Sequence, residues 1–151
     1  MPSIPETFWS ELTARLKAPP LFGVPVLQIK REHRVPVTRE KSPAVYVVEG
    51  TARLLKKTAC DWRWEMPCTV EVYARGDEGL TAADAILCEV VQRINPEAAT
   101  PIVAYANGVN VELVEIAPDT EIADEDATAV KIELLVQFAT RRWTIDAPAA
   151  G

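Results

Sequence analysis

Alternation of apolar and polar residues over the C-terminal part of the chain predicts its two longest strands. A period of two places successive side chains on opposite faces of a strand, so one face of each segment is apolar enough to join a core. We therefore expect a long hairpin between Val109 and Trp143, whose connection is acidic. The positions expected on its core-facing side are Val109, Val111, Leu113, Val130, Ile132, Leu134, Val136 and Phe138.

Two segments carry the apolar spacing of amphipathic helices. The first runs from Pro5 to Lys17, and Pro5 suits its first turn because no N–H is needed there. The second follows Thr81, which we expect to cap it, and ends before Asn95-Pro96. The expected core-facing stripes are Ile4, Phe8, Leu12 and Leu16 in the first helix, and Leu80, Ala83, Leu87, Val91 and Ile94 in the second.

The remaining pattern predicts shorter strands. Val24 to Arg31, Ala44 to Glu49 and Cys68 to Arg75 are apolar or alternate. Asn107-Gly108 favours a two-residue hairpin turn, with a loose loop as the alternative. Gly50 to Pro67 is expected to be the most irregular segment.

This order of elements predicts an α+β fold. We expect a two-layer sandwich in which a mostly antiparallel sheet of four to five strands carries two helices on one face, in the order α-β-β-β-α-β-β. A length of 151 residues fits one domain, residues 1–151, with no linker that would mark a second.

Composition places the chain among ordinary soluble globular proteins. It is 48% hydrophobic and 25% charged, and no apolar run approaches the ~20 residues of a membrane span. The first residues lack a basic stretch followed by an apolar one, so we expect no signal segment and a protein that stays in the cytoplasm unless an assembly carries it elsewhere.

Charge is distributed unevenly along the chain. Residues 1–75 hold 12 basic and 8 acidic side chains, and residues 76–151 hold 4 basic and 14 acidic. The overall acidity argues against wrapping of nucleic acid, which requires a basic surface. Two halves of opposite charge could instead meet in a head-to-tail contact between copies, the geometry that closes rings. The alternative is that the halves interleave in the fold and the asymmetry has no consequence.

Candidate reaction chemistry is sparse. The only histidine, His33, falls in a polar segment without a recognisable nucleophile or orienting partner. The three cysteines, Cys60, Cys68 and Cys88, form no C-x-x-C pair, so we expect reduced, structural thiols. We therefore expect no catalytic residue, no cofactor and no bound metal, and we do not expect an enzyme.

Basic and aromatic residues cluster within the segment Gly50 to Pro67. Such a mixture can stack on single-stranded nucleic acid, and it is equally typical of protein interfaces. A third interpretation is a plain strand, because D-W-R-W-E alternates and both tryptophans would then pack on one face. We favour the strand or the protein interface for this acidic chain. The residues are Arg53, Lys56, Lys57, Trp62, Arg63 and Trp64.

The connection inside the long hairpin is rich in carboxylates. Its spacing lacks the alternating ligands and the glycine of a calcium-binding EF-hand loop. A solvated turn or a contact with a partner fits better, because carboxylates cannot be buried unpaired. The residues are Asp119, Glu121, Asp124, Glu125 and Asp126.

Several of these segments together resemble a known family. They are V-E-V-Y-A-R-G-D (Val70–Asp77), A-A-D-A-I-L (Ala82–Leu87), the stretch E-L-V-E-I-A-P-D-T-E-I-A-D-E-D-A-T-A-V (Glu112–Val130) and a last strand that ends in R-R-W. With an N-terminal amphipathic helix, this pattern resembles the tail terminator (minor tail, or tail completion) proteins of long-tailed bacteriophages.

The resemblance implies a structural role in the virion. Such proteins form a hexameric ring that caps the tail tube, stops its polymerisation and offers a surface for head-tail joining. It implies a homo-oligomer whose partners are the tail tube protein and the head-tail connector protein, with DNA passing through the lumen without specific binding. It also implies assembly in the cytoplasm of the bacterial host. The cluster around Trp62 would then contact a neighbouring subunit or the tube, and the acidic loop would face the lumen or a subunit. Alternatives are another connector or stopper protein, or a small cytoplasmic enzyme or ligand-binding domain.

Overall fold

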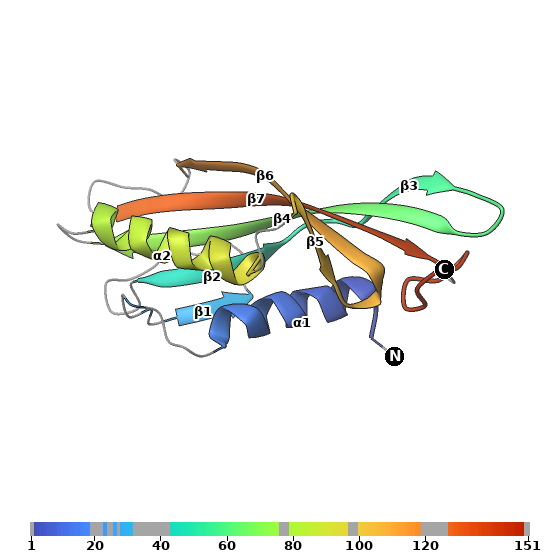
Figure 1. Cartoon of the computed structure of the whole chain (residues 1–151), viewed down its shortest axis with the longest axis horizontal. Coiled ribbons are helices and arrows are strands. Elements are labelled where there is room, and N and C mark those ends of the chain that lie inside the picture. The colour runs from blue at the N-terminus through green and yellow to red at the C-terminus, as the bar shows by residue number, and fades with distance from the viewer. Residues whose placement is uncertain are drawn as a thin grey trace.

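A computed structural model describes residues 2–18, 23, 26, 28–31, 43–75, 79–96, 100–118 and 127–149. The elements follow one another as α1 (Ile4–Lys17), β1 (Gln28–Arg31), β2 (Ala44–Glu49), β3 (Arg53–Lys57), β4 (Trp62–Arg75), α2 (Gly79–Ile94), β5 (Ile102–Tyr105), the short 3-10 helix η2 (Ala106–Gly108), β6 (Val109–Pro118) and β7 (Ala127–Thr140). The predicted α+β class with its two helices is confirmed (Figure 1).

The strands form a seven-stranded sheet in the order β1-β2-β4-β7-β6-β5, with β3 attached to β4. Only the β1–β2 pair is parallel, and every other pairing is antiparallel. The sheet divides between β4 and β7. On the β4 side lie the other strands of the first 75 residues, β1, β2 and β3, and on the β7 side lie the other later strands, β5 and β6. The two oppositely charged halves of the chain therefore do not interleave within the sheet.

The sheet holds more strands than the four to five expected, because the structure adds β3 and β5. The prediction that residues 50–67 are irregular is wrong: β3 pairs with the first part of β4, which extends the expected strand from Cys68 back to Trp62. A hairpin at Asn107-Gly108 is confirmed, since β5 pairs with β6, but its connection is the three residues of η2 and not the two predicted. Asn107 and Gly108 both have a positive φ, at 62° and 72°, which the tight turn requires.

Both helices cover the same face of the sheet (Figure 1). The stripe predicted for α1 is buried, with Leu12 and Leu16 completely inaccessible. The predicted core face of β7 is buried as well from Ile132 to Phe138. Burial of these side chains between the two layers supplies the main stabilising free energy of the fold.

Helix α2 is rotated relative to the prediction. Its buried side chains include Ile86 and Val90, whereas Leu87 and Val91 are half-buried. The helix begins at Gly79, so Thr81 lies within its first turn and is not the expected cap. An apolar stripe in a sequence identifies a helix, but the packing of its neighbours decides which side of a broad stripe is covered.

The C-terminal ends of the two helices are joined by hydrogen bonds from arginine side chains. Arg15 Nη1 of α1 donates a hydrogen bond to the carbonyl oxygen of Ile94 at 3.2 Å. Arg93 Nη1 of α2 donates to the carbonyl oxygens of Leu16 and Ala18 at 2.8 and 2.7 Å. Cations at these positions satisfy carbonyl groups that a helix end leaves open and interact favourably with its dipole.

Candidate assembly surfaces

The structure brings the six predicted basic and aromatic residues together in one hairpin. Three lie on β3 and three on β4, and the pairing places Lys56 opposite Arg63 and Lys57 opposite Trp62. This hairpin projects beyond the helices at one end of the molecule (Figure 1). The set is therefore contiguous in space, as a contact surface requires.

The aromatic side chains of this hairpin pack on one another. The Trp62 and Trp64 ring centroids are 6.3 Å apart, and Trp64 stacks on Phe138 of β7 at 6.2 Å. Trp64 Nε1 also donates a hydrogen bond to Thr140 Oγ1 at 3.0 Å. The plain-strand interpretation of D-W-R-W-E is confirmed, because both rings are half-buried on the same face.

Trp143 extends this aromatic group, and sequence reasoning did not place it there. Its ring centroid lies 4.8 Å from that of Trp62, yet 86% of the residue is exposed. It has a positive φ of 58°, which is rare for a bulky residue. The chain after β7 folds back here, since the Ala149 N–H donates to the carbonyl oxygen of Ala139 at 3.1 Å. The only sequence signal was a tryptophan directly after two arginines.

The charges of the hairpin are largely available to a partner. Arg53 is 74% exposed at its side chain and pairs with Glu65 of β4. Lys57 Nζ lies 5.5 Å from the centre of the Trp62 ring, a cation–π distance. Within the described part of the chain, no carboxylate pairs with Lys56, Lys57 or Arg63. This end of the molecule therefore presents a basic and aromatic surface.

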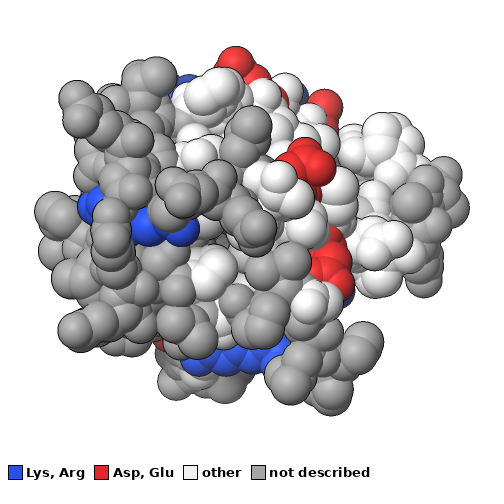
Figure 2. Space-filling model, turned by 90° about the vertical axis from the view of Figure 1, so that its left-hand side faces the viewer, with Lys and Arg blue, Asp and Glu red and all other residues white. Residues whose placement is uncertain are grey.

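The acidic loop that was predicted as a second contact surface lies outside the described residues. The strands on either side of it, β6 and β7, form the predicted long hairpin. Figure 2 views the opposite end of the molecule from the projecting hairpin, and there the acidic and basic groups of the described residues occupy separate parts of the surface.

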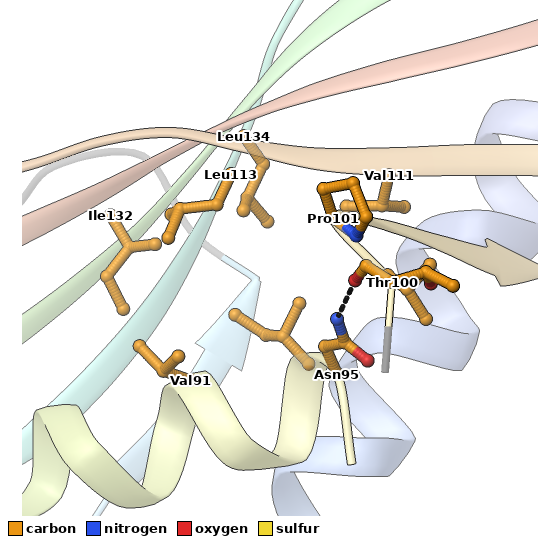
Figure 3. Close-up of a pocket in the computed structure, with 10 residues that line it drawn as sticks. Val91, Asn95, Thr100, Pro101, Val111, Leu113, Ile132 and Leu134 are labelled. Carbon is orange, nitrogen blue, oxygen red and sulfur yellow. Dashed lines mark hydrogen bonds between the residues drawn. The ribbon is translucent and has the colours of Figure 1, made fainter. Parts of the chain in front are cut away.

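A cavity of about 320 Å³ opens between the end of α2 and strands β5 to β7 (Figure 3). Its lining is mainly apolar, and the nearest polar contact is the hydrogen bond from Asn95 Nδ2 to the carbonyl oxygen of Thr100 at 3.2 Å. None of the described lining residues has a side chain that ionises near neutral pH. The lining residues are Val91, Ile94, Asn95, Thr100, Pro101, Val103, Val111, Leu113, Ile132 and Leu134.

The thiols behave in two ways. Cys68 is buried, as its position in an alternating strand predicted, and burial raises the pKa of its thiol well above the ordinary value. Cys88 lies on α2 but is exposed, so the expectation of a structural thiol is wrong for this residue. Cys60 is also exposed, and all three thiols are free.

Neither a metal centre nor a membrane-crossing helix is found in the described residues. No three histidine, cysteine, aspartate or glutamate side chains there gather closely enough to hold a metal ion. No helix in the same residues is long and apolar enough to cross a bilayer.

One ion-pair network was not foreseen from the sequence. Arg31 at the end of β1 donates from Nη1 and Nη2 to the two carboxylate oxygens of Glu6, both at 2.8 Å, and from Nε to Glu49 at 2.7 Å. The hydrogen bond from Arg31 lowers the pKa of Glu6, and the hydrogen bond to Glu6 raises the pKa of Arg31. The three residues lie far apart in the sequence, so only the tertiary structure reveals this link between α1, β1 and β2.

Comparison with known proteins gives a similarity in fold. No family model matches the chain, and no curated protein matches it in sequence. Its fold is similar to that of a chain in the solved structure described as the virion of native gene transfer agent (GTA) particle. The two chains are 10% identical and superpose with a TM-score of 0.52 over 89% of this chain and 93% of that one. At this identity the comparison shows a shared fold.

Proposed function

We propose that this chain is a structural protein of a phage-like virion and acts as a tail terminator. The observation that carries the proposal is the fold similarity to a chain of a gene transfer agent virion, which extends over nearly the whole of both chains. Independently of that comparison, the sequence pattern resembles the tail terminator proteins of bacteriophages, which are also virion components. Two unrelated lines, one from residues and one from fold, therefore support a virion component.

The surfaces of the described residues support assembly more than catalysis. The cavity between α2 and strands β5 to β7 has no titratable lining side chain among them, and an exposed tryptophan lies beside a basic hairpin. Tryptophan and arginine are enriched among the residues that dominate binding at protein interfaces. We therefore propose a protein without enzymatic turnover or cofactor, whose partners are other virion proteins.

In the proposed assembly, copies of the chain form a ring, with six subunits expected from the family resemblance. The ring caps the tail tube, stops its growth and presents a surface to the head-tail connector protein. Arg53, Lys56, Lys57, Trp62, Arg63 and Trp64 contact a neighbouring subunit or the tube. The acidic residues Asp119, Glu121, Asp124, Glu125 and Asp126 face the lumen or a subunit, where their charge would keep passing DNA from adhering. Assembly takes place in the bacterial cytoplasm.

Tube capping is the direct test. Tail tube subunits polymerised with and without the purified chain are compared by electron microscopy. A terminator shortens the length distribution and adds a ring at one tube end. Tubes of unchanged length with no end density would contradict the proposal.

Another virion component, such as a stopper or connector protein, is the second candidate. The neighbouring structure is described as a whole particle, which fits that class as well. A connector would bind tail-less heads and leave free tubes uncapped, so the same preparation incubated with purified heads separates the two functions.

A further inference from the structure

We infer that the exposed edge of β3 in one copy docks along the open edge of β6 in a second copy, so that one sheet continues into the next. This inference rests on the proposed ring, and it names the surface with which the basic hairpin makes contact.

Several strand edges are open in the described residues: β1 and β5 end the sheet, and two further open stretches lie on β6 and β3. Strand β6 has ten residues, but β5 pairs only with the first four, so residues 113–118 have β7 on one side and no strand on the other. Strand β3 has five residues and pairs only with β4. The two stretches match in length, each roughly 17–20 Å at ~3.3 Å per residue. Unpaired backbone groups of this kind are a template for another strand.

The two open edges have opposite charge. Arg53, Lys56 and Lys57 lie on β3, which has no acidic residue. Glu115 lies on the open stretch of β6 and Glu112 directly precedes it, and β6 has no basic residue. Because β3 and β1 form one side of the sheet and β5 and β6 the other, this contrast continues the segregation of the two halves of the chain. Complementary charge steers association and rejects the pairing of like edges.

The acidic edge carries a repulsion that such a partner would relieve. Glu115 lies directly opposite Glu133 of β7 in the sheet. Like charges at directly opposite positions destabilise a strand pair. Lys131 Nζ is 3.4 Å from Glu133, while no described residue forms an ion pair with Glu115. A lysine or arginine of a docked β3 would supply the missing cation.

Both edges also expose apolar side chains at equivalent irregularities. A bulge interrupts β3 between Leu54 and Lys56 and interrupts β6 between Leu113 and Glu115. The extra residues are Leu55, 54% exposed, and Val114, 60% exposed. Bulges and lysines can serve only to keep an edge from pairing. An edge that needs only protection gains nothing from an exposed apolar residue at its bulge, whereas a docked edge would bury it.

The placement of the two edges fits a head-to-tail contact. Figure 1 shows the β3 hairpin projecting at one end of the long axis and β6 running toward the other end. A contact between two different surfaces on opposite ends leaves one of each free, so further copies add in the same way. Such an interface closes into a ring when the rotation between copies allows it.

Charge exchange between the edges tests this contact in the full-length chain. Lys56→Glu with Lys57→Glu gives two acidic edges, and Glu112→Lys with Glu115→Lys gives two basic ones. We expect each pair to raise the apparent dissociation constant of the oligomer about tenfold or more, measured by light scattering across a concentration series. Mixing the two variants, or combining all four substitutions in one chain, should restore the native oligomer.

Controls separate the contact from general charge effects and from misfolding. Lys17→Glu with Asp84→Lys alters exposed helix residues and should leave the oligomer unchanged. All variants should keep the native circular dichroism spectrum, because every altered side chain is exposed. Folded reversed variants that assemble like the native chain, or a mixture that fails to recover, would overturn the inference.

Cross-linking supplies a readout that does not depend on charge. In a chain with Cys60→Ser and Cys88→Ser, the pair Leu55→Cys and Val114→Cys should give a ladder of covalent oligomers with a short bismaleimide. Leu55→Cys with Asp84→Cys should not. A ring that caps tubes without this ladder would overturn the inference and leave the proposed function intact. A cross-linked oligomer that does not cap tubes would support the inference and contradict the proposed function.

Discussion

The two halves of β4 differ in burial, although they form one continuous strand. From Cys68 to Ala74 nearly every side chain is buried, including Val70 and Val72 on the helix-covered face and Tyr73 on the other. From Trp62 to Glu65 the side chains are half-buried or exposed. The buried half lies between β2 and β7, whereas the other half lies between β3 and β7 and is not covered by a helix (Figure 1).

This contrast shows how one strand can join a stable body to a surface available for contact. The buried half gains stability from apolar packing, which is satisfied within one chain. The projecting half retains exposed aromatic and basic groups, which gain contact only from a partner. Substitutions should therefore affect stability in the body and assembly in the projecting hairpin.

The largest expected effect compares two leucines. Leu12 is completely buried and Leu55 is 54% exposed. Leu12→Ala should lower the free energy of unfolding by about 2–5 kcal/mol, because it opens a cavity in the core. Leu55→Ala should change it by no more than ~0.5 kcal/mol. Urea denaturation followed by circular dichroism measures both, and equal losses would remove the distinction between body and hairpin.

The next effect depends on pH and concerns Tyr105, where the helices meet β5. Its hydroxyl donates to the carbonyl oxygen of Ile94 at 2.9 Å, and burial raises the pKa of Tyr105 from 10.0 to about 12. Above pH 10 the hydroxyl of Tyr105 ionises in the unfolded chain, whereas in the folded chain it stays protonated up to about pH 12. The contribution of the protonated hydroxyl to the free energy of unfolding is complete below pH 10, and it should fall by roughly 2–3 kcal/mol between pH 10 and 12.

The control for this pH dependence is Tyr105→Phe, which keeps the ring and removes the titrating group. The difference in unfolding free energy between the native chain and this variant should shrink as the pH rises above 10. A difference that stays constant from pH 8 to 12 would show that Tyr105 does not cause the alkaline loss.

A smaller effect concerns how the projecting hairpin is anchored on β7. Trp64 Nε1 donates to Thr140 Oγ1, and Thr140 is completely buried. In a double-mutant cycle, Trp64→Phe and Thr140→Val should be coupled by about 1 kcal/mol. The matched cycle uses Trp62→Phe, whose indole N–H has no hydrogen-bond partner in the described residues, and should show no coupling with Thr140→Val. Similar coupling in both cycles would assign the effect to packing.

The smallest effect is expected at the exposed network of Arg31. Its side chain is 27% exposed, and those of Glu6 and Glu49 are 49% and 40% exposed. Such pairs are screened by water and salt. Arg31→Gln should lower Tm by no more than about 2 °C at low salt, and less at high salt.

The same network predicts a pH direction. Because Arg31 lowers the pKa of Glu6, the contribution of this pair is present above the ordinary pKa of a carboxyl group and is lost as the pH falls through the lowered value. Thermal unfolding of the native chain and Arg31→Gln at pH 7 and at acidic pH measures it. A difference that grows on acidification would contradict this assignment.

The elements differed in how well their sequence patterns predicted them. Strand β2 was predicted to the residue, because it is a short apolar run that ends before Gly50, and α1 to within one residue, because its apolar residues recur at helical spacing. β3 was missed because R-L-L-K-K has no alternation, and it is ordered through its pairing with β4. The clustering of basic and aromatic residues in the β3–β4 hairpin was visible in the sequence, but their neighbour Trp143 was not predicted, since a chain reversal after β7 brings it there.

The sequence alone determined both helices and the strands that have an apolar or alternating pattern, because such patterns depend on residues close together in the chain. Only the tertiary structure decided that the basic and acidic halves lie on opposite sides of one sheet and that β3 and part of β6 keep open edges. Strand order is set by pairings between distant residues such as Trp62 and Thr140, and no local period encodes them.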